Sequence, residues 1–321
     1  MSSRGRVFVL VAIAATAASG VVVAGVLATR NHVPATPKPR PGVPRLSLDF
    51  GVRDDAETQA LQQAESLYNS GKLGEAAKAF ARDRSLEGRV GAAMAAWPHG
   101  TVAALQDLQA EHPKSSLVAL HFGLALYYLH RDGDAASAWQ AAASDQPDTP
   151  YAVRANDLLH PQFAPGLPAF VPSFPVPLQA RVQSPQRRLA SLRRAAAVGG
   201  AHAKLLYGAY LQQLERPVSA ERQFAAAARL APNDPDARTA AAVGLFDKGA
   251  PAKAFGNLGP LTRVFPHAQT VRFHLGELLL WSAQVKEARR QLQLAEQGGA
   301  NTIIGVQAKR FLDALDRAGT S

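Results

Sequence analysis

The sequence predicts an all-α protein built as a solenoid of helix–turn–helix repeats. Three sets of residues recur at an interval of 34, the length of one two-helix repeat. The sets are Ala220, Ala254 and Ala288; Phe224, Leu258 and Leu292; and Ala227, Leu261 and Ala295. Pairs of prolines show the same interval: Pro113 and Pro147, and Pro232 and Pro266. Small residues let two helices approach closely, large residues fill the space toward the next repeat, and proline ends the second helix.

The stretch from Gly208 to Pro232 carries the pattern most fully. It has a small residue at the eighth position, alanine at the twentieth, an aromatic residue at the twenty-fourth and proline at the thirty-second. In these positions the sequence resembles the tetratricopeptide repeat (TPR) family. The resemblance implies a right-handed α-solenoid that binds partners along a concave face lined by the first helix of each repeat.

The chain divides into seven predicted segments. They are a short basic tail at 1–6, a transmembrane helix (signal anchor) at 7–28, a Pro-rich linker at 29–55, N-terminal TPR repeats at 56–160, a Pro/Phe-rich insertion at 161–185, C-terminal TPR repeats at 186–302 and a capping helix at 303–318. Residues 150–200 are interpreted as a single repeat whose turn carries the insertion, because insertions in repeat proteins map to loops.

The predicted anchor is a run of 22 uncharged residues from Val7 to Ala28. As a helix with a rise of ~1.5 Å per residue, a run of this length spans a bilayer core. The basic residues on its two sides nearly balance, and we expect the N-terminus inside and the repeats on the extracytoplasmic side. A small residue at every fourth position suggests dimerisation through this helix: Ala12, Thr16, Gly20, Ala24 and Ala28. The alternative is cleavage after Val26-Leu-Ala28, which would release the rest of the chain.

Two proline-rich stretches interrupt the helical pattern. The linker is predicted to be a semi-rigid spacer that holds the repeats away from the membrane. The insertion at 161–185 holds seven prolines, which exclude a regular helix, and three phenylalanines, Phe163, Phe170 and Phe174. Exposing these rings to water is costly, so we expect the insertion to fold back onto the solenoid, with Leu120, Leu124 and Tyr128 as expected contacts. The alternative is an arm that a partner covers.

Candidate partner-binding residues follow from the repeat register, which places one side of each first helix on the concave face. They are Leu117, Leu120, Leu124, Tyr127, Tyr128, His202, Leu205, Gln212, Phe246, Phe273, Glu277, Leu280 and Trp281. This predicted groove is apolar and aromatic and suits an extended or helical apolar segment. In the alternative interpretation, these side chains belong to the core or contact the insertion.

The residue inventory argues against catalysis. Cysteine is absent, which excludes a disulfide scaffold, a thiolate metal site and a thiol nucleophile. The nine histidines are scattered, and His121 and His130 are interpreted as packing or surface residues. No catalytic, phosphate-binding or zinc motif is present, so we expect no enzyme activity, no cofactor, no metal and no nucleic-acid partner. The net charge is +6 over residues 1–53, −6 over 54–160 and +10 over 161–321, which indicates surfaces with different preferences or simply solvated faces.

Together these features predict a membrane-anchored TPR scaffold for protein–protein interaction, in a bacterial envelope assembly or secretion complex. The alternative is a secreted soluble protein that binds a peptide or ligand after signal-peptide cleavage.

Overall fold

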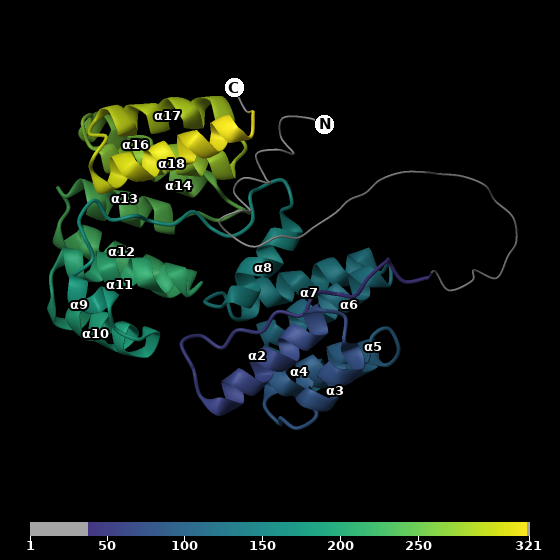
Figure 1. Ribbon diagram of the computed structural model, residues 1–321. Helices are drawn as coiled ribbons and strands as arrows, with labels where there is room; N and C mark the ends of the chain where they lie inside the picture. Colours follow the sequence, from purple (N-terminus) through teal and green to yellow (C-terminus); the bar gives the residue numbers. More distant parts are fainter. Residues whose placement is uncertain (1–37, 320–321) are drawn as a thin grey trace, which may run out of the picture. The chain divides into compact units, whose positions relative to one another are not determined.

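The computed structural model describes residues 38–319, and all regular secondary structure in this range is α-helical (Figure 1). The chain forms two compact units, with the boundary between Gln146 and Pro147. The N-terminal unit contains six helices: α2 (Ala56–Asn69), α3 (Leu73–Phe80), α4 (Leu86–Ala95), α5 (Thr101–Glu111), α6 (Ser116–Tyr128) and α7 (Asp132–Asp145).

The C-terminal unit contains the remaining helices of the described range. They are α8 (Pro150–Leu159), α9 (Leu178–Arg181), α10 (Pro185–Val198), α11 (Ala201–Gln213), α12 (Pro217–Leu230), α13 (Pro235–Gly244), α14 (Ala252–Leu258), α15 (Leu261–Val264), α16 (Gln269–Trp281), α17 (Val285–Gln297) and α18 (Ile303–Arg317). Within each unit, consecutive helices other than α8 pack against each other, and successive pairs stack into an α-solenoid, as the 34-residue period predicts.

Caps at both ends fix where the helices begin and turn. Side chains at the N-caps accept a hydrogen bond from the first turn of α2, α4, α6 and α8: Asp55, Ser85, Ser115 and Thr149. Four first helices end in a residue with positive φ: Gly71, His130, Glu215 and Ala283. This left-handed residue closes the turn into the second helix of the pair.

The packing rule read from the sequence is confirmed. A Cβ atom added to Gly208 would lie 2.4 Å from the Phe224 ring, and one added to Gly123 would lie 2.4 Å from the Trp139 indole. The alanines of the 34-residue set are all buried, as are the large residues of the same period. Glycine and alanine therefore let the two helices of a pair approach closely, and an aromatic ring fills the space between them.

One helix is divided, and two features differ from the prediction. Pro260 separates α14 from α15, because proline has no N–H group to continue the ladder of helical hydrogen bonds. The segment 161–185 is not wholly irregular, since α9 forms between Pro177 and Pro185. Residues 150–200 do not form one repeat, because α8 and α10 do not pack as a pair and α10 packs on α11 instead.

The predicted basic tail, the transmembrane helix and the first part of the linker lie outside the described residues. Within residues 38–319, no helix combines the length and the apolar character that crossing a bilayer requires. The rest of the linker is extended, as expected, but it is not a free spacer. Leu46, Leu48 and Phe50 are buried, so residues 38–50 are docked on the N-terminal unit.

Candidate functional site

Each unit holds an extended segment of the chain against the first helices of its repeats. We call residues 38–50 the first strap and residues 161–177 the second strap. The inner helices are α2, α4 and α6 in the N-terminal unit and α11, α13 and α16 in the C-terminal unit. These helices form the surface on which the sequence predicts partner binding.

The first strap is bound through its main chain by side chains from α2 and α6. The Tyr68 hydroxyl donates to the Pro44 carbonyl (2.6 Å), Asn69 Nδ2 donates to the Leu46 carbonyl (3.2 Å), the Ser47 N–H donates to His121 Nε2 (3.2 Å) and the Leu48 N–H donates to Glu65 Oε1 (2.9 Å). Pro44, Leu46 and Leu48 contact α2, whereas Ser47 contacts α6, because successive residues of an extended chain point in opposite directions.

Arg40 holds the outer end of the first strap. Its guanidinium group forms a two-pronged ion pair with the Asp132 carboxylate, with both N–O distances at 3.0 Å, and lies 3.6 Å above the centre of the Tyr127 ring. Its main-chain N–H donates to the Tyr128 carbonyl (2.7 Å). Asp132 and Tyr127 are both exposed, so this end is held by contacts that water screens.

The second strap is bound in the same manner but by more groups. Its N–H groups donate to acceptors on all three inner helices: Ala164 to the Trp281 carbonyl (3.2 Å), Ala169 to Glu277 Oε1 (3.0 Å), Phe170 to Gln212 Oε1 (2.8 Å), Val171 to His274 Nε2 (2.8 Å) and Ser173 to Asp236 Oδ2 (2.9 Å). Main-chain recognition of this kind depends little on the side chains of the bound segment.

Aromatic contacts bury the second strap. Phe170 is 3% exposed, stacks on the His274 ring at a centroid distance of 5.1 Å and meets the Phe224 ring edge-on at 5.5 Å. Phe163 packs on Phe246, and Phe174 stacks on His202 at 4.3 Å. The insertion therefore folds back onto the solenoid, as predicted. These partners belong to the C-terminal unit, in place of the expected Leu120, Leu124 and Tyr128.

A buried ion pair fixes the start of the second strap. The Lys248 ammonium group donates to the Asp157 carboxylate and to the Ala164 carbonyl (2.6 Å), and the same carboxylate accepts the Gly166 N–H at 3.0 Å. Burial lowers the pKa of Lys248, and the Asp157 charge opposes this shift. This ion pair could not be predicted from the sequence, because its members are 91 residues apart.

Two buried side chains under the second strap have strongly shifted pKa values. Burial raises the pKa of Glu277 to about 8, which the hydrogen bond from Ala169 partly opposes. Burial lowers the pKa of His274 to about 4. The neutral imidazole fits its site, since Nδ1 lies 2.6 Å from the Thr270 carbonyl and Nε2 accepts the Val171 N–H. A proton on Nε2 would point at this N–H group.

The predicted partner-binding residues fall into two groups. Several contact a strap: Tyr127, Tyr128, His202, Gln212, Phe246, Glu277 and Trp281. Five others are buried: Leu117, Leu120, Leu205, Phe273 and Leu280, and Leu124 is half-buried. The prediction missed the polar groups that bind strap main chain, Glu65, Tyr68, Asn69, His121, Asp236 and His274. Only His121 had a signal in the sequence, as a polar residue within the otherwise apolar α6.

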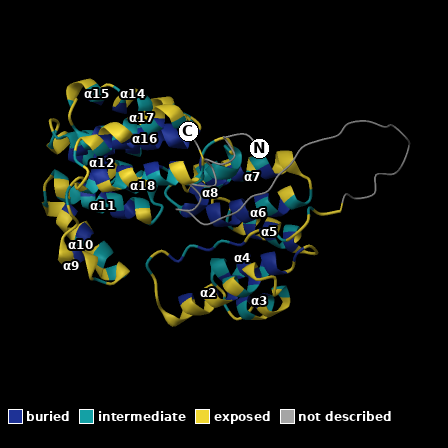
Figure 2. Cartoon of the chain, turned by 45° about the horizontal axis from the view of Figure 1, so that its top comes forward, coloured by how far each residue is buried: buried dark blue, intermediate teal, exposed yellow. Residues whose placement is uncertain are grey.

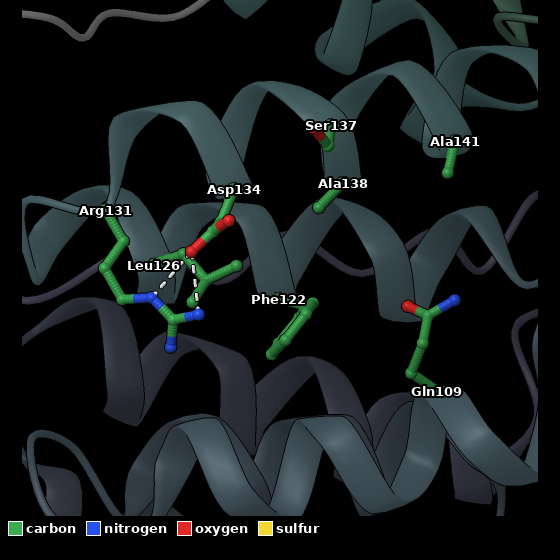
Figure 3. Close-up of a pocket in the computed structure, with 8 residues that line it drawn as sticks. All are labelled: Gln109, Phe122, Leu126, Arg131, Asp134, Ser137, Ala138 and Ala141. Carbon is green, nitrogen blue, oxygen red and sulfur yellow. Dashed lines mark hydrogen bonds and ion pairs between the residues drawn. The ribbon is translucent and has the colours of Figure 1, made fainter.

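A second feature of the N-terminal unit is an open hollow of about 280 Å³ on α5, α6 and α7 (Figure 3). Phe122 and Leu126 line it together with small residues of α7. At one end, the Arg131 guanidinium group pairs with the Asp134 carboxylate at 2.7 Å. Among residues 38–319, no three His, Asp or Glu side chains are placed to share a metal ion.

Comparison with known proteins finds no matching family model and no matching curated protein. Among solved structures, the TPR protein YrrB, described with an unusual peptide-binding site, is 15% identical over 65% of this chain and 99% of its own, with a TM-score of 0.31. A TPR protein from Parabacteroides merdae is 13% identical over 80% of this chain and 98% of its own, with a TM-score of 0.34. The TPR2AB domain of yeast Sti1 in complex with pHSP90 is 13% identical over 82% of this chain and 98% of its own, with a TM-score of 0.31. These values are low, and no conclusion about this chain rests on them.

Proposed function

We propose that this chain is a membrane-anchored, non-enzymatic scaffold that holds other proteins through its α-solenoid, in a bacterial envelope assembly or secretion complex. The anchor is the uncharged run at 7–28, which also allows dimerisation, and the repeats lie on the extracytoplasmic side. The partners are proteins or peptides with an extended segment.

The observation that carries this proposal is the way in which the inner helices bind the straps. In both units, polar side chains of the inner helices pair with the main chain of an extended segment. In the C-terminal unit, aromatic rings also cover the apolar side chains of this segment. A surface with these groups recognises an extended polypeptide by its backbone. The chain's own straps thus model how a partner segment binds.

A partner gains access at the outer end of the first strap. Residues 38–43, which precede the buried Pro44, are held chiefly by the contacts of Arg40 with Asp132, Tyr127 and Tyr128. An exposed ion pair such as that of Arg40 with Asp132 contributes only about 0–1 kcal/mol. Release of this end uncovers Tyr127 and Tyr128, while the buried Leu46 keeps the rest of the strap in place. The second strap, with its buried rings, stays bound.

Site-specific photocrosslinking in living cells tests this mode of binding. A photoreactive phenylalanine analogue replaces Tyr127, and a matched variant carries it at Val264, an exposed position on α15. We expect crosslinks to a partner from position 127 only, and stronger ones when Asp132→Ala releases the strap. If position 264 crosslinks to the same partner equally well, or if Asp132→Ala has no effect, this binding mode is wrong.

Membrane fractionation tests the anchor separately. We expect the full-length chain in the membrane fraction and a chain without residues 1–28 in the soluble fraction, with an unchanged helical circular dichroism spectrum. The second candidate function, a secreted soluble binding protein, is favoured by the small residues at Val26-Leu-Ala28. N-terminal sequencing separates the two, since a mature chain that begins at Thr29 would support secretion.

A further inference from the structure

The surface of α9 and α10 combines exposed aliphatic side chains with exposed arginines. Leu178 and Val182, four residues apart, are 71% and 76% exposed, and Val198 at the end of α10 is 92% exposed. Three arginines are exposed on α10: Arg187, Arg193 and Arg194. Figure 2 shows α9 and α10 largely in the colour of exposed residues. We call these six residues the α9–α10 surface.

Specific contacts hold this surface in shape. The Arg188 side chain donates from Nε to the Ala180 carbonyl (2.7 Å) and from a terminal nitrogen to the Arg181 carbonyl (2.6 Å), which ties α9 to α10. Ala180 and Leu192 are buried beneath. The exposed leucine and valine are therefore presented by a fixed turn, and their exposure is a property of the folded unit.

The charge of this region is one-sided. No aspartate or glutamate occurs from residue 158 to residue 214, whereas the same stretch contains six lysines and arginines. Among the ion pairs of residues 38–319, none includes an arginine of the α9–α10 surface. Positive charge without internal compensation favours an anionic partner.

We propose that the α9–α10 surface binds the anionic lipid headgroups of a membrane surface, with Leu178 and Val182 inserted at the level of the headgroups. Arginines beside exposed aliphatic side chains are the combination that binds an anionic interface. An acidic protein would satisfy the arginines but leaves no role for the separate, protruding aliphatic side chains. The inference rests on the proposed anchoring in one respect, since the anchor supplies the high local concentration of lipid.

A single fluorescent label tests the contact. The sequence contains no cysteine, so Val182→Cys can be labelled uniquely with nitrobenzoxadiazole in the full-length chain. The labelled protein is added to vesicles of phosphatidylcholine alone or of equal parts phosphatidylcholine and phosphatidylglycerol. We expect a blue shift and a several-fold rise in emission only with phosphatidylglycerol, and its loss at high salt. Val264→Cys is the matched control and should not respond, since it lies on α15, at the opposite end of the C-terminal unit from α9 and α10 in Figure 2.

A triple variant, Arg187→Gln with Arg193→Gln and Arg194→Gln, should abolish the shift at an unchanged helical content. Equal emission with both lipids, an equal response at position 264, or the same shift from soluble polyglutamate without vesicles would each overturn the proposal. Flotation with pure phosphatidylcholine vesicles reports on the anchor alone. A chain that floats without the lipid-dependent shift contradicts only the α9–α10 contact, whereas a chain that shows the shift without floating contradicts only the anchor.

Discussion

The two units bind their straps with side chains at the same positions of their first helices. Counted back from the left-handed residue that ends the helix, His121 and His274 both lie nine residues before it, and both accept a strap N–H at Nε2. Glu65 and Glu277 lie six residues before it, and both accept an N–H at Oε1. The two units therefore use the same two helix positions to bind straps of different sequence.

The difference lies in what covers the bound main chain. The first strap buries aliphatic side chains and leaves its outer end, with Arg40, near the surface. The second strap buries Phe170 above His274 and Glu277, which are themselves fully buried. Removing the second strap would leave these polar groups in an apolar site without partners, which is costly. The same arrangement of inner-helix side chains thus holds a first strap whose outer end can be released and a second strap that is part of the core.

Among the changes that test this comparison, replacing Phe170 by alanine should lower the unfolding free energy most. Deletion of a fully buried phenylalanine ring costs roughly 3–5 kcal/mol of unfolding free energy, and here it also uncovers two buried polar groups. Urea unfolding followed by amide exchange of peptides from residues 147–319 reports on the C-terminal unit. Phe174→Ala, at a half-buried position of the same strap, is the control and should cost clearly less. Equal losses for the two variants would mean that the second strap is not core.

Overpacking the helix pairs should lower the stability by a smaller amount, and by the same amount in both units. Ala135 and Ala254 occupy the same repeat position and are fully buried, so leucine at either site should cost about 1–3 kcal/mol. Amide exchange measured by mass spectrometry locates the loss in one unit or the other. A parent-like Ala254→Leu variant beside a destabilised Ala135→Leu variant would show that the break at Pro260 relaxes the packing there.

The sequence was sufficient to predict the repeats and the folding back of the insertion, but not the docking of the first strap. Ala220 and Phe224 could be placed because neighbouring repeats impose one spacing on every pair, and a spacing is visible in a sequence. The docking of Leu46 could not be predicted, since it depends on partners some 20 to 75 residues away that share no period with it. For the same reason the Pro-rich linker looked like a free spacer.

Partner binding at the predicted groove residues stays a prediction. The register selected several residues that contact the straps, such as Gln212 and Glu277, and contact with the insertion is the alternative stated for the groove. The register could not separate these from Leu205 or Phe273, which point into the stack, because consecutive inner helices bury more than one side of each helix. The buried histidines were interpreted as packing residues, and the sequence alone does not show which groups their nitrogens meet.

The pH dependence of stability should distinguish the second strap from the first strap. The folded-state pKa of Glu277, about 8, is above its usual value, so its contribution is complete below pH ~4.5 and is lost as the pH rises through 8. The folded-state pKa of His274, about 4, is below its usual value, so its contribution is complete above pH ~6.5 and is lost as the pH falls through 4. We expect unfolding free energy to fall by about 1–2 kcal/mol from pH 6.5 to 9.

Two variants separate these contributions. Glu277→Gln keeps an oxygen for the Ala169 N–H and should remove the decline at alkaline pH, whereas His274→Gln should remove the decline at acid pH. The readout is amide exchange at residues 169–171. If Glu277→Gln leaves the alkaline decline intact, a different group titrates, and the carboxyl is not held neutral under the strap.

The smallest expected effect on stability comes from the residues with positive φ that end the first helices. Ala283 has a φ of 57°, a conformation that costs a residue with a Cβ atom about 1–2 kcal/mol, whereas Gly71 occupies the corresponding place in α2 without that cost. Ala283→Gly should stabilise the C-terminal unit by about 0.5 kcal/mol, because greater freedom of glycine in the unfolded chain offsets part of the gain. Gly71→Ala should destabilise the N-terminal unit by a similar amount. Thermal unfolding of both variants checks the pair, and a loss of stability in Ala283→Gly would show that the two turns are not equivalent.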